Sequence, residues 1–192
     1  MIELRFPDGQ SRQYPDGSSG RDVALSISPS LEKRALLVKL DGKLLDLDRP
    51  LEGGGAIEIV TREAPQALEV IRHDTAHVLA EAVQELFPGT QVTIGPNVED
   101  GFYYDFARNE PFSLDDLPAI EARMRQIVDR DEKIVREVVD RDAAIADFRA
   151  MGEVYKAEII EGIPAGEPVT VYRQGAWKDL CRGPHLPSTK HV

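Results

Sequence analysis

Two pairs of residues combine reactive side chains with the same short spacing. His73 and His77 are four residues apart in a segment with helical character, so they share one face of that helix. Cys181 and His185 are also four residues apart, and the intervening Gly183-Pro184 predicts a turn that brings the ends together. The chain has four histidines and one cysteine. We therefore predict that four of these five residues form a single site.

Three imidazoles and a thiol are compatible with more than one hydrolytic chemistry. They are ligands that zinc prefers, but four protein ligands would close the tetrahedron and leave no open position for a substrate. Without a metal, imidazoles exchange protons near neutral pH and a thiol can hydrogen-bond a water or a substrate. Cys181 as a nucleophile is a third interpretation, and its alternative is a thiol that packs against or orients a histidine. The metal-bound and metal-free interpretations both indicate hydrolysis.

The helix that carries the histidine pair has an apolar stripe on another face. At about 100° per residue, this predicted core face consists of Leu68, Ile71, Thr75, Leu79, Ala82 and Leu86. His73 and His77 lie roughly 140–180° from its centre on the same geometry. We therefore expect both imidazoles to face outward into a water-accessible cleft that they share with Cys181 and His185. The alternative is a pair of solvated surface histidines.

Residues 1–62 have the pattern of a small mixed domain. Ile2, Leu4 and Phe6 alternate with polar residues as in a half-buried strand, and a Pro-Asp-Gly turn leads to a second strand at residues 11–14. A helix is expected over residues 20–28, ended by Pro29. Strands are expected at residues 35–40 and 56–60. This order fits a β-grasp, ubiquitin-like domain, with a boundary near residues 61–65.

Residues 63–192 are predicted to form a second domain, in which a long helix packs on an antiparallel sheet. The helix covers residues 65–87 and ends at Pro88-Gly89. Further helices are expected at residues 113–131 and 140–151, and further strands at 91–94, 102–106 and 134–139. A hairpin is expected from residues 168–172 and 177–181. The fold class of the whole chain is α+β.

The charge distribution limits how the chain can bind nucleic acid. The formal net charge is −11, of which residues 1–62 carry −1 and residues 63–192 carry −10. Surfaces that bind nucleic acid through phosphates are basic, so any RNA substrate is expected to touch this chain only through its end. No apolar run approaches the roughly 20 residues needed to cross a bilayer. No membrane partner is therefore expected. One cysteine cannot form an internal disulfide, so a cytoplasmic location is expected.

Three segments resemble one enzyme family. These are the helix with His73 and His77, the run from Gly95-Pro96 to Gly101-Phe102-Tyr103-Tyr104-Asp105, and Asp179-Leu180-Cys181-Arg182-Gly183-Pro184-His185. Together they resemble the editing domain of bacterial threonyl-tRNA synthetases, and residues 1–62 resemble the TGS domain that precedes it. Alanyl-tRNA editing domains share the two pairs, but the leading β-grasp domain and the aromatic run favour the threonyl family.

The resemblance implies a proofreading reaction on the acceptor end of threonine tRNA that carries serine. Serine is threonine without a methyl group, and a difference of that size provides only about 1–3 kcal/mol of discrimination. A second site that hydrolyses the smaller product solves this problem. The resemblance therefore implies an aminoacyl-tRNA ester hydrolase, the editing part of a class II threonine–tRNA ligase.

The resemblance also assigns residues to the editing pocket. The implied catalytic residues are His73, His77, Lys156, Cys181 and His185, and the implied substrate contacts are Asp179, Tyr104 and Gly95. Lys156 is expected to hold a water or the oxyanion, and His73 to position or deprotonate the terminal ribose hydroxyl or the water. Asp179 is expected to bind the substrate ammonium. For Lys156 and Asp179 the alternative is solvated surface charge. For Tyr104 and Gly95 the alternative is strand packing and a turn.

We expect no metal in this site, with zinc as the alternative. In the alanyl relatives the two pairs resemble a zinc site, whereas the threonyl family's pocket looks metal-free, and a cationic Lys156 would be repelled by zinc. The family's aminoacylation domain, with its ATP, magnesium and zinc sites, has no counterpart here, and the editing domain is expected to be truncated at its C-terminus. The remainder of the synthetase is an expected partner, and a homodimer is expected only for the full-length enzyme.

Two rival functions remain open at this point. The first is a zinc-dependent hydrolase outside this reaction, or an alanyl-type protein that edits in trans. The second is a non-catalytic module in which the β-grasp domain contacts RNA or regulates another protein.

Overall fold

The computed structural model describes all 192 residues, Met1–Val192, and the chain divides into two compact units. The first comprises Met1–Ile71, Gly183–Pro187 and His191, and the second comprises Arg72–Arg182, Ser188–Lys190 and Val192. Both units contain helices together with mainly antiparallel strands that follow one another in runs, which confirms the predicted α+β class. None of the helices combines the length and the apolar character that crossing a membrane requires.

The first unit contains a five-stranded mixed sheet. Its elements are β1 (Ile2–Arg5), β2 (Ser11–Tyr14), α1 (Gly20–Ile27), α2 (Pro29–Arg34), β3 (Ala35–Leu40), β4 (Lys43–Asp46) and β5 (Gly55–Thr61). The strand order is β2-β1-β5-β3-β4. The pair β1–β5 is parallel and the other pairs are antiparallel. This is the arrangement expected of a β-grasp domain.

Helix α1 packs on this sheet through a close approach at its first residue. A Cβ atom on Gly20 would lie 2.5 Å from Cβ of Val38 in β3, so only glycine fits there. The helix begins with a capping box between Ser19 and Asp22. Pro29 does not simply end this helix as predicted, because it occupies the first turn of α2, where a missing N–H costs nothing.

The second unit is built around one long helix. Its elements are α3 (Pro65–Leu86), β6 (Gln91–Val92), β7 (Asn97–Val98), β8 (Gly101–Phe102), β9 (Phe106–Ala107), a 3-10 turn η1 (Leu114–Asp116), α4 (Leu117–Asp129), β10 (Ile134–Val139), α5 (Arg141–Ala150), α6 (Val154–Glu161), β11 (Val169–Gln174), β12 (Trp177–Leu180) and a second 3-10 turn η2 (Thr189–His191). The first residues of α3 belong to the first unit. Strands β10, β11 and β12 form an antiparallel sheet, and β6–β9 and β7–β8 are short antiparallel pairs.

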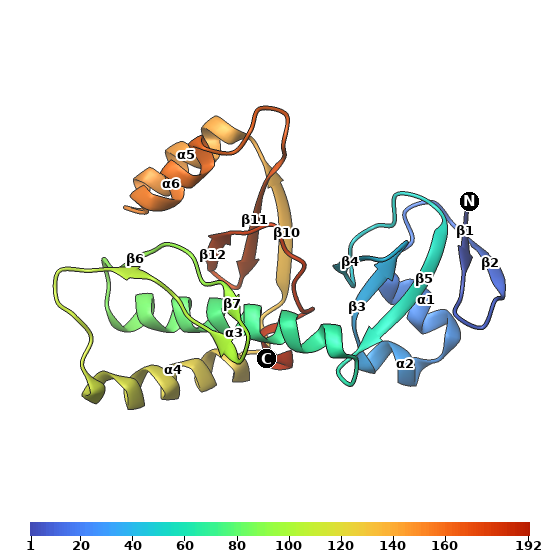
Figure 1. Ribbon diagram of the computed structural model, residues 1–192, viewed down its shortest axis with the longest axis horizontal. Helices are drawn as coiled ribbons and strands as arrows, with labels where there is room; N and C mark the ends of the chain where they lie inside the picture. The colour runs from blue at the N-terminus through green and yellow to red at the C-terminus, as the bar shows by residue number, and fades with distance from the viewer. The chain divides into compact units, whose positions relative to one another are not determined.

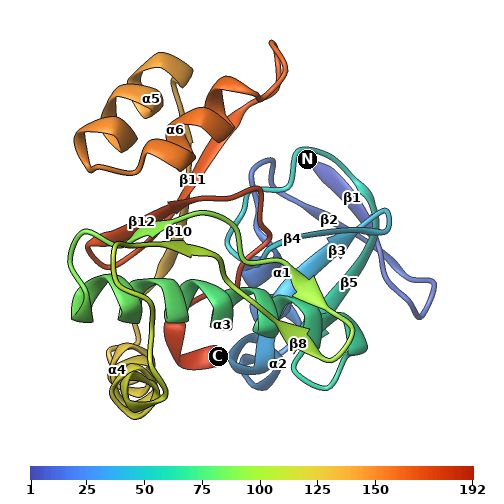
Figure 2. The same ribbon diagram turned by 60° about the vertical axis from the view of Figure 1, so that its left-hand side comes forward.

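Within the second unit, α3 lies between α4 and the strands (Figures 1 and 2). Val78 and Val83 of α3 pack with Ile127 of α4 in one apolar cluster. Helices α5 and α6 run side by side in both views, and their cluster with β11 centres on Phe148 and Ile160. The long helix therefore forms the core of this unit together with the elements on both of its sides.

The predicted core face of α3 was wrong. Leu68 of the predicted stripe is 51% exposed, whereas His77, which was expected to face outward, is 6% exposed. The buried residues of α3 lie around its whole circumference: Ala67, Val70, Asp74, Ala76, His77, Val78, Ala80, Glu81, Ala82 and Val83. Because other elements cover several faces of α3, its apolar stripe does not identify which residues are accessible.

Two segments near the candidate site also differ from the predictions. Residues 102–106 do not form one strand, because β8 ends at Phe102 and β9 begins at Phe106. Helix α6 was not predicted at all. It begins after Gly152, whose φ of 81° is in the left-handed region that favours glycine. Both departures matter for function, since these segments carry Tyr104 and Lys156.

Candidate functional site

The structure brings His73, His77 and Cys181 together. Nε2 of His73 lies 3.1 Å from Sγ of Cys181 and 3.2 Å from Nε2 of His77. The two imidazole rings meet edge to face, with centroids 4.8 Å apart. Helical spacing places both rings on one side of α3, and Cys181 directly follows β12, where its N–H donates to the Thr170 carbonyl. His73 and Cys181 are partly exposed, so they form the accessible side of this cluster.

Asp179 lies behind these residues and is almost completely buried. Its Oδ2 is 3.1 Å from Nδ1 of His77 and accepts a hydrogen bond of 2.9 Å from the hydroxyl of Tyr104. Its Oδ1 is 2.7 Å from Nζ of Lys156. Asp179 therefore already faces one cation and one imidazole. A substrate ammonium would have to share this carboxylate with Lys156 or replace it.

Lys156 belongs to the same network and not to the surface. Its side chain is 4% exposed and that of Asp179 is 1% exposed, which rules out the alternative of solvated surface charges. Nζ of Lys156 also donates to the Tyr104 hydroxyl at 3.4 Å. Lys156 is the third residue of α6, the helix that the sequence did not predict.

Tyr104 and Gly95 are neighbours through the aromatic ring. A Cβ atom on Gly95 would lie 2.3 Å from Cδ2 of Tyr104, so the absence of a side chain lets the ring lie across this backbone. The ring of Tyr104 also stacks on Phe106, with centroids 5.0 Å apart. Gly95 thus has a packing role that explains its residue type. Its predicted contact with substrate stays a prediction.

Charge and burial shift the ionisation of the buried groups. Burial disfavours the charged form of His77, but the hydrogen bonds to Asp179 and Cys181 outweigh it and raise the pKa of His77 to about 9. Burial likewise acts against the charged form of Asp179, yet Lys156 and His77 hold the pKa of that carboxyl well below its usual range. Burial raises the pKa of Tyr104 above its ordinary value, with the Asp179 charge acting in the same direction. At neutral pH the network therefore contains a carboxylate, an imidazolium and a neutral phenol.

His185 belongs to the first compact unit and not to the second. Its segment, Gly183–Pro187, belongs to that unit, and its N–H donates to Oδ1 of Asp46 at 2.7 Å. The side chain is 3% exposed. The prediction that it acts with Cys181, from which three residues separate it in the chain, stays a prediction.

Two further residues next to the site could not be identified from the sequence. The indole of Trp177 lies against the His77 ring, with centroids 5.8 Å apart, and its Nε1 donates to Oε1 of Gln84 at 2.7 Å. Gln84 is two helical turns beyond His77 in α3, and Trp177 begins β12. An amide and an indole are common in packed cores, so only the folded structure identifies them as the support for His77.

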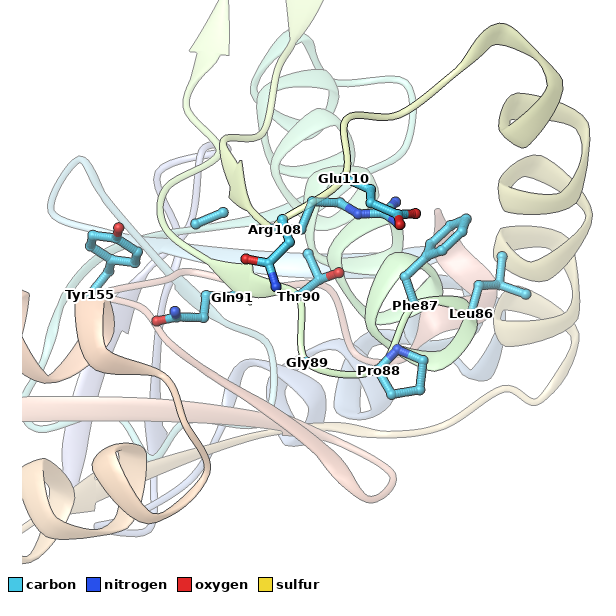
Figure 3. A pocket seen from close by; sticks show the side chains of 11 residues that line it. Leu86, Phe87, Pro88, Gly89, Thr90, Gln91, Arg108, Glu110 and Tyr155 are labelled. Carbon is cyan, nitrogen blue, oxygen red and sulfur yellow. The ribbon is translucent and has the colours of Figure 1, made fainter.

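A hollow of about 720 Å³ lies elsewhere in the second unit, beside the end of α3 (Figure 3). Its lining includes Phe87, Gln91, Arg108 and Tyr155, and none of the predicted site residues. The ring of Tyr155 stands at one end and that of Phe87 at the other. The hollow offers no imidazole, thiol or amine to a reacting group, so we do not place the reaction there.

The donor atoms of the site also fit zinc. The side-chain donor atoms of His73, His77 and Cys181 lie within 4.8 Å of one another. A carboxylate that accepts from the other nitrogen of a histidine, as Asp179 does for His77, is typical around bound zinc. Against this, Lys156 next to Asp179 places a positive charge near the same donor atoms, and this charge would repel zinc.

Comparison with known proteins matches both ends of the chain to family models. Residues 2–61 match the TGS domain, and residues 169–192 match the threonyl and alanyl tRNA synthetase second additional domain. The second match includes β11, β12 and Cys181.

Whole-chain comparison gives the same family. The chain is 79% identical over 198 residues to a threonine–tRNA ligase of Caulobacter sp. (strain K31), with all of the chain and 30% of the relative covered. It is 73% identical to the ligase of Phenylobacterium zucineum (strain HLK1) and 64% identical to that of Hyphomonas neptunium (strain ATCC 15444), over 29% of each. The chain thus spans about a third of the length of these relatives. It belongs to the threonyl-tRNA synthetase family and corresponds to the N-terminal region of those enzymes.

Proposed function

We propose that this chain removes serine wrongly attached to threonine tRNA by hydrolysing the ester bond at the acceptor end. The observation that carries the proposal is the cluster of His73, His77 and Cys181 beside the buried pair of Lys156 and Asp179. These groups can orient a water, exchange protons and stabilise negative charge, which are the needs of ester hydrolysis. The similarity to threonine–tRNA ligases supplies the substrate class.

In this proposal the accessible and buried residues have different tasks. His73 positions or deprotonates the attacking water or the terminal ribose hydroxyl, and Cys181 contributes a hydrogen bond to the same water. His77 holds His73 in place, since its own orientation is fixed by Asp179. Lys156 stabilises the oxyanion that forms on the carbonyl oxygen. We include His185 among the catalytic residues because of its sequence motif. Tyr104, Gly95 and Asp179 are proposed to contact the substrate.

In this proposal the site contains no metal. The alternative is a zinc site, since the imidazole and thiol groups are ligands that zinc prefers. If zinc bound, His73, His77 and Cys181 would hold it, and it would supply a more acidic water. Metal analysis of protein purified without chelator decides between the two. One zinc per chain would overturn the metal-free assignment and favour a zinc-dependent or alanyl-type hydrolase.

We further propose that the chain acts as the proofreading part of a longer enzyme in the cytoplasm. Amino-acid activation, with its ATP, magnesium and zinc sites, and the homodimer contacts belong to the rest of that enzyme. Because residues 63–192 carry a net charge of −10, the chain is proposed to touch only the end of the tRNA.

The test is to incubate the chain with seryl- and threonyl-charged threonine tRNA and follow ester loss. Serine is expected to be released faster than threonine, and H73A and K156A are expected to slow its release by at least about 100-fold. The exposed Lys133 on the same unit provides the matched control K133A. Equal release of both amino acids at the uncatalysed rate from folded protein would favour the non-catalytic RNA-contact or regulatory module.

A further inference from the structure

Glu153 is a buried carboxylate at the start of the helix that carries Lys156. It is 5% exposed and occupies the N-cap position of α6. Polar side chains that cap a helix at this position accept a hydrogen bond from its first turn. The side chain of Glu153 makes no such bond. Helix capping therefore does not explain why the carboxylate is buried here.

The carboxylate instead binds two other elements of the second unit. Oε2 accepts from the N–H of Val92 in β6 at 3.0 Å, and Oε1 accepts from Nε2 of Gln84 in α3. Close by, the N–H of Val154 donates to Oε1 of Gln91 at 3.0 Å. The first turn of α6 is thus attached to β6 and α3 by polar contacts, while Ala157 and Ile160 attach the rest of the helix through the apolar cluster.

The same contacts lead to both sides of the candidate site. Gln84, which donates to Glu153, accepts from Nε1 of Trp177, and the indole lies against His77. In the other direction, Lys156 lies three residues after Glu153, on the first turn that the carboxylate holds. The side chain of Glu153 is therefore linked both to the Lys156 amine, through the first turn of α6, and to the His77 ring, through Gln84 and Trp177.

We propose that Glu153 is a positioning residue that holds Lys156 against Asp179 and fixes the Gln84–Trp177 support of His77. The inference rests on the proposed hydrolysis for its kinetic consequences. Glu153 touches neither a substrate nor a reacting atom in this proposal and acts only through the groups that it orients. Displacement of a catalytic group by about 1 Å costs on the order of 100-fold in rate.

The principal test compares E153Q with E158Q in the full chain. Glu158 is an exposed residue of the same helix, so the control removes the same charge without touching the contacts. The Glu153 carboxylate accepts two hydrogen bonds, whereas the amide of E153Q has only one acceptor oxygen. E153Q must therefore lose one of the two hydrogen bonds. We expect kcat for seryl ester hydrolysis to fall about 10- to 100-fold in E153Q with KM within about threefold, and E158Q to match the unmodified chain. A kcat of E153Q within about threefold of E158Q would overturn the proposal.

A double-mutant cycle separates positioning from general stability. Because Glu153 acts partly through Lys156, E153Q is expected to cost clearly less activity in K156A than in the unmodified chain, and only the part that acts through Gln84, Trp177 and His77 should remain. Fully multiplicative losses would mean that Glu153 does not orient Lys156, and would also overturn the proposal. If E153Q does not fold, E153D keeps the charge but is one methylene too short to reach both donors, and it replaces E153Q in the cycle.

A measurement that needs no substrate tests the positioning role of Glu153 independently of the proposed hydrolysis. The rate of Lys156 acetylation by a small amine-reactive reagent is measured by mass spectrometry, with the exposed Lys133 as an internal reference. We expect E153Q to raise the Lys156-to-Lys133 ratio severalfold and E158Q to leave it unchanged. An unchanged ratio in E153Q overturns the positioning role. If the unmodified chain does not hydrolyse the seryl ester, the proposed function fails while this ratio still tests Glu153.

Discussion

Replacing Asp179 with asparagine removes the negative charge that faces two buried basic side chains. Lys156 and His77 lie 2.7 Å and 3.1 Å from its oxygens, and the side-chain exposures of the three residues are 4%, 7% and 1% for Lys156, His77 and Asp179. The asparagine side chain has nearly the same shape, so the packing is retained and the charge is lost. Breaking a buried ion pair by removing one partner costs about 3–5 kcal/mol. We expect D179N to lower the free energy of unfolding by that amount at neutral pH.

The loss is expected to depend on pH in a defined way. The pKa of His77 is raised from 6.5 to about 9 in the folded chain, so its contribution to stability is complete below about pH 6.5 and disappears as the pH rises through 9. The pKa of Asp179 is lowered from 3.8, so the same contact is lost at the acid end as the pH falls below that value. The stability difference between D179N and the unmodified chain should therefore be largest between about pH 4 and 6.5 and shrink towards pH 9. His77 accounts for only part of this difference, because Cys181 also raises its pKa.

Urea unfolding at pH 5.5, 7 and 9 measures this difference, and the single tryptophan, Trp177, reports from beside His77. D129N is the control, because Asp129 is an exposed carboxylate on α4. Titration of the His77 imidazole by NMR should give a pKa near 9 in D129N and a much lower one in D179N. A stability loss below about 1 kcal/mol at pH 5.5, or a His77 pKa that D179N leaves unchanged, would refute the reasoning from burial and charge.

Two further outcomes follow from the second unit. Burial raises the pKa of Glu81 from 4.5 to about 7, so its ionisation destabilises the folded chain as the pH rises from 4.5 to 7, and the stability of the unmodified chain relative to E81Q should fall by about 3 kcal/mol over that window. Parallel pH profiles in urea unfolding would contradict this. G95A should push the Tyr104 ring away from Asp179 and lower the unfolding temperature and the seryl ester hydrolysis together. Crystals of G95A with the Tyr104 hydroxyl still within about 3 Å of Asp179 would disprove the packing argument.

The pairing of His73 with Cys181 shows what sequence spacing can predict. Residues four apart on a helix share a face whatever surrounds them. Because the chain has only one cysteine, few residues could have been its partners in a reactive site. The β-grasp domain was predictable for a similar reason, because alternation and turn residues are local features. In both cases a few neighbouring residues contain the information.

The burial of His77 and Lys156 could not be predicted in this way. An apolar stripe indicates one buried face, but α3 is covered by α4 on one side and by strands on the other, so its polar residues are buried as well. Helix α6 escaped prediction because its short run after Gly152 has no periodic apolar pattern. The partners that make buried charge tolerable here, such as Asp179 for Lys156, are distant in sequence.

The burial of most of α3 determines which inherited substitutions inactivate the protein but leave it folded. Since the residues that would perform the chemistry also fill the interior of the second unit, a damaging substitution at His77 removes folded protein as well as reactivity. A loss of 1–2 kcal/mol is enough to change cellular abundance several-fold through chaperone and protease surveillance. Variants that persist as abundant but inactive copies should therefore be found at the accessible His73 and Cys181 rather than on the enclosed side of the helix.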